Sequence, residues 1–142
     1  MIKVNYPPFQ YKIKGEENKE LIFDEVRKKW VRLKPEEWVR QNVIQYLLQV
    51  LKYPASLLSI EKELKLGELR KRCDVIVYRE AAAWMIIECK EPNVPLSEKT
   101  LEQILRYHLA IPVPYLCLTN GNNVYLFEKI NNNFREIGEF PK

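Results

Sequence analysis

The chain has 142 residues, of which 46% are hydrophobic and 30% are charged, and its formal net charge is +4. This length and composition predict one ordinary globular domain that buries about two-thirds of its unfolded surface. No apolar run approaches the roughly 20 residues of a membrane span, and the N-terminus lacks the apolar core of a secretory signal. We therefore expect a cytoplasmic protein with no membrane partner.

The basic residues are concentrated in two segments. Six Lys or Arg residues lie from Arg27 to Arg40, and five lie from Lys62 to Arg72. Tryptophan and tyrosine side chains lie within or beside these clusters. Such a pattern suits binding to a phosphate backbone, although a solvated charged surface is the commoner explanation for it.

Residues 1–34 are expected to form an N-terminal arm that packs on the core, and residues 35–142 to form the single main domain. Within the arm, segments 9–13 and 20–24 predict a β-hairpin around a turn at residues 15–18.

A first helix begins at Pro35, because proline suits the first helical position and the acids that follow suit the positive end of the helix dipole. The helix is expected to end near Tyr53. Projected at about 100° per residue, Glu36 falls within the apolar face, Glu37 at its edge, and Arg40 inward. Glu36 therefore needs a partner, which is either Arg40 at i+4 or a metal site.

Three strand-like runs follow, and then a second helix runs from a cap at Ser97 to about Ala110. Further strand-like runs come after this helix, separated by asparagine-rich turns. This order predicts an α/β fold with a mixed central β-sheet flanked by helices. The predicted strands are residues 59–66, 72–78, 83–90, 115–119, 124–130 and 134–140.

Asp74, Glu88 and Lys90 place charge on strands that should bury aliphatic side chains. Glu88 and Lys90 are two residues apart, so they point to the same face of their strand. If the strands form an antiparallel hairpin, Asp74 lies opposite Glu88 with Cβ atoms roughly 4.5–5.5 Å apart. Carboxylates that close repel each other unless a cation lies between them. The spacing therefore predicts a divalent-cation site.

The register of this hairpin depends on a three-residue loop at residues 80–82, which has no Gly, Asn or Asp for a left-handed position. A longer loop or a β-bulge about the same centre preserves the pairing of the acids, whereas a one-residue slip destroys it. The same register places Cys73 opposite Cys89, on the side away from the acids. We expect both to be small core residues, with a disulfide as the alternative.

An acid on the first helix, Asp74 on one strand and Glu88-x-Lys90 on the next resemble the PD-(D/E)xK nuclease superfamily. Gln103 and Tyr107 on the second helix match the QxxxY element of the RecB-like branch of that superfamily. The resemblance implies a restriction-endonuclease-like core.

Two longer segments, residues 27–41 and 113–121, look like small stand-alone proteins related to the N-terminal nuclease domain of type I restriction enzyme R subunits. The similarity covers nearly all of residues 22–130. The restriction subunit joins this domain to an ATP-driven translocase, whereas this chain has neither the length nor a GxxxxGK[ST] phosphate loop. We therefore expect no bound nucleotide and no translocation by the chain itself.

The resemblance implies that Asp74, Glu88 and the backbone carbonyl of Cys89 bind Mg²⁺, with Mn²⁺ as a substitute. Lys90 would orient or deprotonate the attacking water and stabilise the developing charge. Three cysteines, one histidine and no Cys-x-x-Cys pair argue against a zinc site or an iron–sulfur cluster.

Glu36, or failing that Glu37, would anchor a second ion or hold a metal-bound water. Gln103 and Tyr107 share a helix face and would position Lys90 or a phosphate. Contacts to the DNA backbone, which position a duplex without reading its sequence, are expected from basic side chains. These are Arg72, Arg106, Arg40 and Lys71.

The expected function is that of a Mg²⁺-dependent nuclease acting on DNA, and the alternative is a catalytically weak or inactive DNA-binding or adaptor module on the same fold. The partners would be DNA and either a second copy of the chain or a larger restriction or repair assembly. Structural alternatives also stand for single residues. Glu88 and Lys90 could form the exposed face of an edge strand, and His108 is expected at the edge of the core rather than in catalysis.

Overall fold

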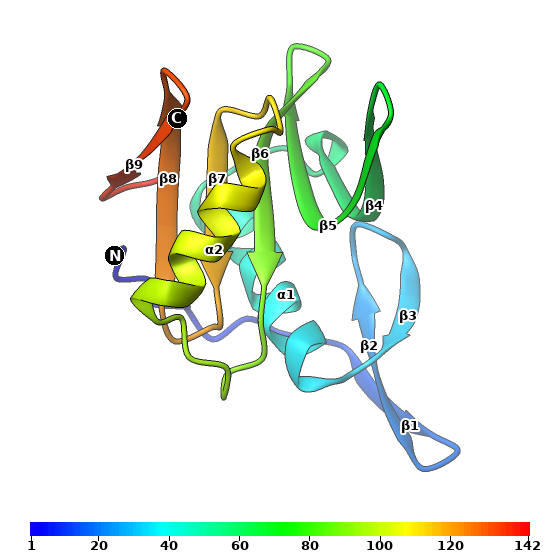
Figure 1. Ribbon diagram of the computed structural model, residues 1–142. Coiled ribbons are helices and arrows are strands. Elements are labelled where there is room, and N and C mark those ends of the chain that lie inside the picture. Colours follow the sequence, from blue (N-terminus) through cyan, green and yellow to red (C-terminus); the bar gives the residue numbers. More distant parts are fainter.

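The computed structural model describes residues 1–142 as two β-sheets and two α-helices (Figure 1). The central sheet has six strands in the order β4-β5-β6-β7-β8-β9, and only the neighbours β6 and β7 run parallel. The predicted α/β fold with a mixed sheet is therefore confirmed. The strands of this sheet are β4 (Leu58–Leu66), β5 (Leu69–Arg79), β6 (Ala82–Cys89), β7 (Tyr115–Thr119), β8 (Val124–Ile130) and β9 (Asn133–Ile137).

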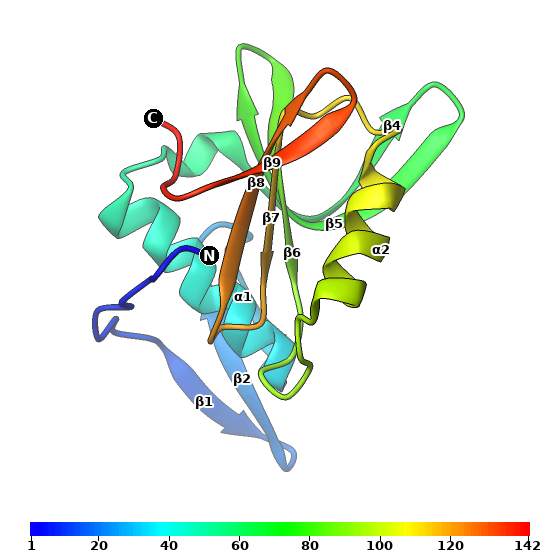
Figure 2. The ribbon, with the colours of Figure 1, turned by 60° about the vertical axis from the view of Figure 1, so that its left-hand side comes forward.

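The two helices cover opposite faces of the central sheet (Figure 2). Helix α1 (Pro35–Gln45) continues into a π-helical turn, Tyr46–Val50, and a short 3-10 turn follows at Ala55–Leu57. Helix α2 (Glu98–His108) begins after Ser97, whose hydroxyl accepts a hydrogen bond from a backbone N–H of the first turn, as the sequence predicts. This helix forms the crossover that allows β6 and β7 to run parallel. No helix of the chain is both long enough and apolar enough to cross a membrane.

Each face of the sheet carries its own apolar core. On the α1 side, Val39, Val43 and Leu47 of the first helical segment pack against β5 and β6 residues such as Val75 and Ile87. On the α2 side, the buried residues come mainly from the sheet, and α2 contributes side chains that are only partly buried. Each fully buried aliphatic side chain contributes roughly 1.5–3 kcal/mol to the free energy of unfolding, so these two cores hold both helices against the sheet.

A smaller antiparallel sheet precedes α1 and projects from the core (Figures 1 and 2). The predicted hairpin is present, but its turn lies at Glu17 and Asn18, both with positive φ. A third strand joins it that the sequence did not indicate, because basic residues flank its two apolar residues. The strands are β1 (Ile13–Glu16), β2 (Lys19–Asp24) and β3 (Lys29–Arg32).

The β5–β6 hairpin has the predicted register in the half that lies farther from its turn. Val75 pairs with Ile87 and Val77 pairs with Met85, which is the alignment that places Asp74 across from Glu88. The predicted three-residue loop is wrong: a bulge lies between Val77 and Tyr78, and the turn itself has two residues. The bulge offsets the shorter turn, so the pairs nearest to the two acids keep the predicted alignment.

The cysteines do not face each other as predicted. Cys73 belongs to the core on the α2 side, and Cys89 belongs to the core on the α1 side. The reason is a local irregularity: Glu61 has a φ of 50° and forms no regular pair, although its neighbours pair normally with β5. The side chains of β4 and β5 change from one face of the sheet to the other at this point. Cys73 and Val75, two residues apart, therefore lie in different cores. All three cysteines are buried and free.

Candidate functional site

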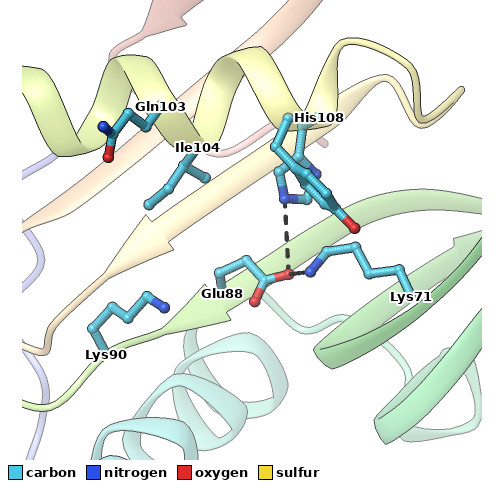
Figure 3. Close-up of a pocket in the computed structure, with 7 residues that line it drawn as sticks. Lys71, Glu88, Lys90, Gln103, Ile104 and His108 are labelled. Atoms are coloured by element: carbon cyan, nitrogen blue, oxygen red, sulfur yellow. Dashed lines mark ion pairs between the residues drawn. The ribbon is translucent and has the colours of Figure 1, made fainter.

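A hollow of about 210 Å³ lies between the end of β6 and helix α2 (Figure 3). Glu88 and Lys90 enter it from the end of β6, and Figure 3 shows Lys90 pointing toward Glu88. Gln103 and Tyr107 enter it from α2, so the predicted shared helix face is present and is directed at the two strand residues. The structure therefore brings four of the candidate catalytic residues together. The remaining lining residues are Lys71, Ile104 and His108.

Glu88 is the acid at the base of this hollow, and only 13% of its side chain is exposed. Lys71 Nζ lies 3.0 Å from Glu88 Oε1, and His108 Nε2 lies 3.9 Å from the same oxygen. Burial raises the pKa of Glu88 and the nearby Asp74 raises it further, while Lys71 acts in the opposite direction. Burial alone would lower the pKa of Lys71, but its ion pair with Glu88 outweighs burial and raises it. Glu88 and Lys71 thus form a buried ion pair.

His108 lies behind this ion pair at the C-terminal end of α2 and is 3% exposed. Burial lowers the pKa of His108 to about 4, and the positive charges of Lys71 and Lys129 act in the same direction. The imidazole is therefore neutral at pH 7. The ring forms part of the buried lining of the hollow, at the edge of the core as the sequence predicts. It adds no charge beside Glu88.

Asp74 lies on the neighbouring strand, and both of its carboxylate oxygens are engaged. Arg40 Nη2 of helix α1 is 2.9 Å from Oδ1, and the backbone N–H of Cys89 donates to Oδ2 over 2.8 Å. Asp74 is close enough to Glu88 to contribute to the raised pKa of that residue. The carboxylate is thus fixed beside the residue that immediately precedes Lys90.

The acids of the first helix occupy different places from those that the helical projection predicts. Glu37 is 8% exposed, whereas the side chain of Glu36 is 45% exposed. Glu36 Oε1 lies 3.6 Å from Arg40 Nη2, the nitrogen that also contacts Asp74. Burial and the charge of Asp74 raise the pKa of Glu36, while Arg40 and Lys90 act to lower it. Glu36 is therefore the helix acid that lies beside Asp74 and Lys90.

Glu37 turns instead into a network of buried ion pairs that includes the N-terminal segment. Arg27 Nη2 is 3.1 Å from both of its oxygens, and Arg40 Nη1 is 2.7 Å from Oε1. Arg27 also binds Asp24, which is fully buried and accepts a further hydrogen bond from Gln41. Burial opposes ionisation of Asp24, but the hydrogen bonds from Arg27 and Gln41 outweigh it and lower its pKa. The projection failed because Arg27, which pairs with Glu37, comes from outside the helix.

The four basic residues expected to contact DNA fall into two groups. Arg72 and Arg106 are exposed, but Arg106 lies beside a separate hollow near Phe134 and not with Gln103 and Tyr107. Arg40 is 4% exposed and pairs with carboxylates, so little of its surface is open to a phosphate. Lys71 lines the hollow as the partner of Glu88. Arg40 and Lys71 therefore neutralise the acids of the site, and their contact with DNA stays a prediction.

Residues 35–141 match the family described as type I restriction enzyme R protein N terminus. The chain belongs to this family. The matched range includes both helices, the central sheet and every residue of the site, whereas β1, β2 and β3 lie before it. This agrees with the resemblance to R subunits that the sequence indicates. No curated protein matches the chain.

In this family member, the donor atoms of the site suit a hard cation. No group of three or more His, Cys, Asp and Glu side chains is close enough to hold a metal ion. Mg²⁺ is usually bound through only one or two carboxylates and keeps several waters, so Asp74 and Glu88 are sufficient in number, although each is already paired with a cation of the chain. Glu88 Oε1 is buried without a hydrogen bond of regular geometry, despite the nearby Lys71, and so retains capacity to coordinate an ion.

The sequence did not predict two ion pairs of the site, that of Lys71 with Glu88 and that of Glu61 with Arg40. The predicted strand began one residue after Lys71, so Lys71 was not placed on the sheet. A signal for the longer strand was available, because Leu66 and Leu69 bracket a Gly-Glu turn and pair across it. Glu61 carried no comparable signal, since its position depends on the irregular backbone of β4.

Proposed function

We propose that this chain is a Mg²⁺-dependent nuclease that hydrolyses phosphodiester bonds in DNA. The observation that carries the proposal is the convergence of Glu88 and Lys90 with Gln103 and Tyr107 in one hollow. Asp74 accepts a hydrogen bond from the backbone N–H of Cys89, the last residue of β6 and the one directly before Lys90. Membership of a restriction-enzyme family supports phosphodiester chemistry, and the match to the PD-(D/E)xK pattern supports the assignment of each residue.

Asp74, Glu88 and the backbone carbonyl of Cys89 would hold the metal. When bound, the ion supplies Lewis-acid chemistry, which makes water a stronger nucleophile and neutralises charge on the phosphate. Glu36 stands beside Asp74 and is half exposed, so it is the helix acid suited to hold a water or a second ion. Glu37 is committed to Arg27 and Arg40 and is not proposed for this role.

Lys90 is proposed to orient the attacking water through its ammonium group and to stabilise negative charge on the reacting phosphate. Its side chain is exposed at the mouth of the hollow, where a substrate can reach it. Gln103 and Tyr107 offer an amide and a hydroxyl on the facing helix, and these groups would hold Lys90 or a neighbouring phosphate. Arg72, exposed on β5, is a candidate for a further phosphate contact.

A second candidate function is a DNA-binding or adaptor module with little or no turnover, docked on a larger restriction or repair assembly. The observation that favours it is the pairing of each acid with a cation of the chain, Asp74 with Arg40 and Glu88 with Lys71. These pairs already neutralise the two carboxylates, so a divalent ion must compete with them.

Incubation with supercoiled plasmid in Mg²⁺ or Mn²⁺ separates the two functions. The wild type is compared with Asp74→Asn and Lys90→Ala, and with Lys65→Ala as an exposed-lysine control on β4. Nicking or linearisation that is lost in the first two variants and kept in the control supports the nuclease. Binding of DNA by the wild type without cleavage in either metal supports the module. A wild type that neither binds nor cleaves DNA overturns both.

A further inference from the structure

A second and larger hollow lies between β3 and helix α1, on the other side of the sheet from α2. We refer to this hollow, of about 450 Å³, as the β3–α1 cleft. Five basic and three acidic residues are among the nine that line it, so its lining carries a net charge of +2. Only one lining residue is hydrophobic, which makes the cleft unsuited to an apolar ligand.

The charges of this cleft divide into a paired floor and an unpaired wall. In the floor, Arg27 and Arg40 form ion pairs with all three acids, Glu36, Glu37 and Glu61. The wall consists of Lys29, Arg32 and Lys34, which are exposed and form none of the ion pairs of the structure. The uncompensated positive charge of the cleft therefore lies on β3 and on the residues that follow it.

The cleft borders Asp74 through two of its lining residues, although it shares no lining residue with the hollow of Glu88 and Lys90. Arg40 lines the cleft and also contacts Asp74 through Nη2, and Glu36 lines it within 3.6 Å of the same nitrogen. The cleft therefore lies next to one of the proposed metal-binding carboxylates. The wall itself comes from residues before 35, outside the matched family range.

We propose that the β3–α1 cleft binds the phosphate backbone of the DNA strand that enters the active site, with Lys29, Arg32 and Lys34 as its phosphate contacts. This inference rests on the proposed function and extends it to the N-terminal sheet. An unpaired row of cations beside a phosphodiesterase site suits a polyanion, and such contacts position a strand without reading its sequence. The ion pairs of Arg27 with Asp24 and Glu37 hold the sheet against α1 and so fix the wall relative to Asp74.

The test is the affinity for a fluorescently labelled DNA duplex, measured by anisotropy in EDTA so that no cleavage takes place. The cleft variant carries Lys29→Gln, Arg32→Gln and Lys34→Gln. A matched control removes the same charge from three exposed lysines outside the cleft. These are Lys3→Gln, Lys52→Gln and Lys142→Gln.

We expect the cleft variant to bind at least about tenfold more weakly at low salt, and its slope of log K against log salt to fall by about 2 to 3, because up to three phosphate contacts are lost. The control variant should keep most of the affinity and the slope. Equal losses in the two triple variants would overturn the cleft as the binding site and leave the nuclease proposal standing. Failure of the wild type to bind any duplex would overturn both.

Discussion

The backbone N–H of Cys89 donates a hydrogen bond to Asp74 Oδ2 over 2.8 Å, so a side chain of β5 bonds the last residue of β6. Asp74 lies at the point where β5 changes face, and its other oxygen contacts Arg40 of α1. One carboxylate thus joins two strands and a helix directly before Lys90. Its position is set by these bonds.

This relationship predicts that Asp74→Asn and Asp74→Ala differ in stability. Asparagine can still accept the Cys89 N–H bond, whereas alanine leaves that donor without a partner and removes one of the carboxylates that pair with the buried Arg40. We expect Asp74→Ala to lower the free energy of unfolding by about 2–3 kcal/mol and Asp74→Asn by about 1 kcal/mol. Urea unfolding of the two variants and the wild type measures the difference. Equal losses would show that the bond to Cys89 contributes nothing.

Lys71 is expected to weaken metal binding, because its ammonium group lies 3.0 Å from Glu88 Oε1 and repels a divalent cation at the same carboxylate. Replacing it with glutamine removes that charge and keeps a polar side chain in the hollow. We predict that Lys71→Gln binds Mn²⁺ at least about tenfold more tightly at pH 8, which corresponds to about 1.4 kcal/mol. Isothermal titration calorimetry gives the affinities, and Arg72→Gln on the same strand is the control. Unchanged or weaker binding would contradict the prediction.

The alignment of Asp74 with Glu88 was predicted from the position of the hairpin turn. The hydrophobic pattern could not supply it, because the runs around Val75 and Ile87 bury side chains on both faces. The assumed loop was one residue too long, and the alignment at Val75 and Ile87 is kept because a bulge offsets the shorter turn. The four-residue spacing of Gln103 and Tyr107 was equally informative, since helical geometry alone puts them on one face.

The parts that could not be predicted depend on contacts between segments distant in sequence. Helical projection cannot show that Arg27 reaches Glu37 from the N-terminal segment, so it assigned the buried position to Glu36. The positive φ of Glu61 likewise has no signature in its residue type, yet it moves Cys73 and Cys89 to opposite faces. Tertiary ion pairs and backbone irregularities, rather than secondary structure, set these limits.

The turn of the β5–β6 hairpin offers a stabilising substitution. Glu80 and Ala81 have φ values of 50° and 63°, a left-handed conformation that disfavours both residue types. Replacing them with Asn-Gly, the pair preferred in two-residue hairpin turns, should raise the free energy of unfolding by about 1–2 kcal/mol. Thermal unfolding should show a higher Tm, and the reverse test, Ala81→Val, should lower it. DNA binding should not change, because the turn lies at the opposite end of the hairpin from Asp74 and Glu88.

The lowered pKa of His108 predicts how the free energy of unfolding depends on pH in metal-free buffer. Its pKa is about 4 in the folded chain, below its ordinary value of 6.5, chiefly because of burial and then of Lys71 and Lys129. Between these values the unfolded chain binds a proton that the folded chain does not, so this contribution to stability is complete above pH 6.5 and is lost as pH falls toward 4. The loss is at most about 3 kcal/mol.

The raised pKa of Glu88 acts in the opposite sense, since a folded carboxyl group that binds its proton more readily gains stability as pH falls. Comparison with His108→Gln isolates the histidine, because Glu88, Lys71 and Lys129 are present in both proteins. Urea unfolding from pH 7.5 to pH 4.5 should show the stability of the wild type falling more steeply than that of the variant. Parallel curves would mean that His108 ionises inside the folded chain, and that the wall of the hollow is open to water.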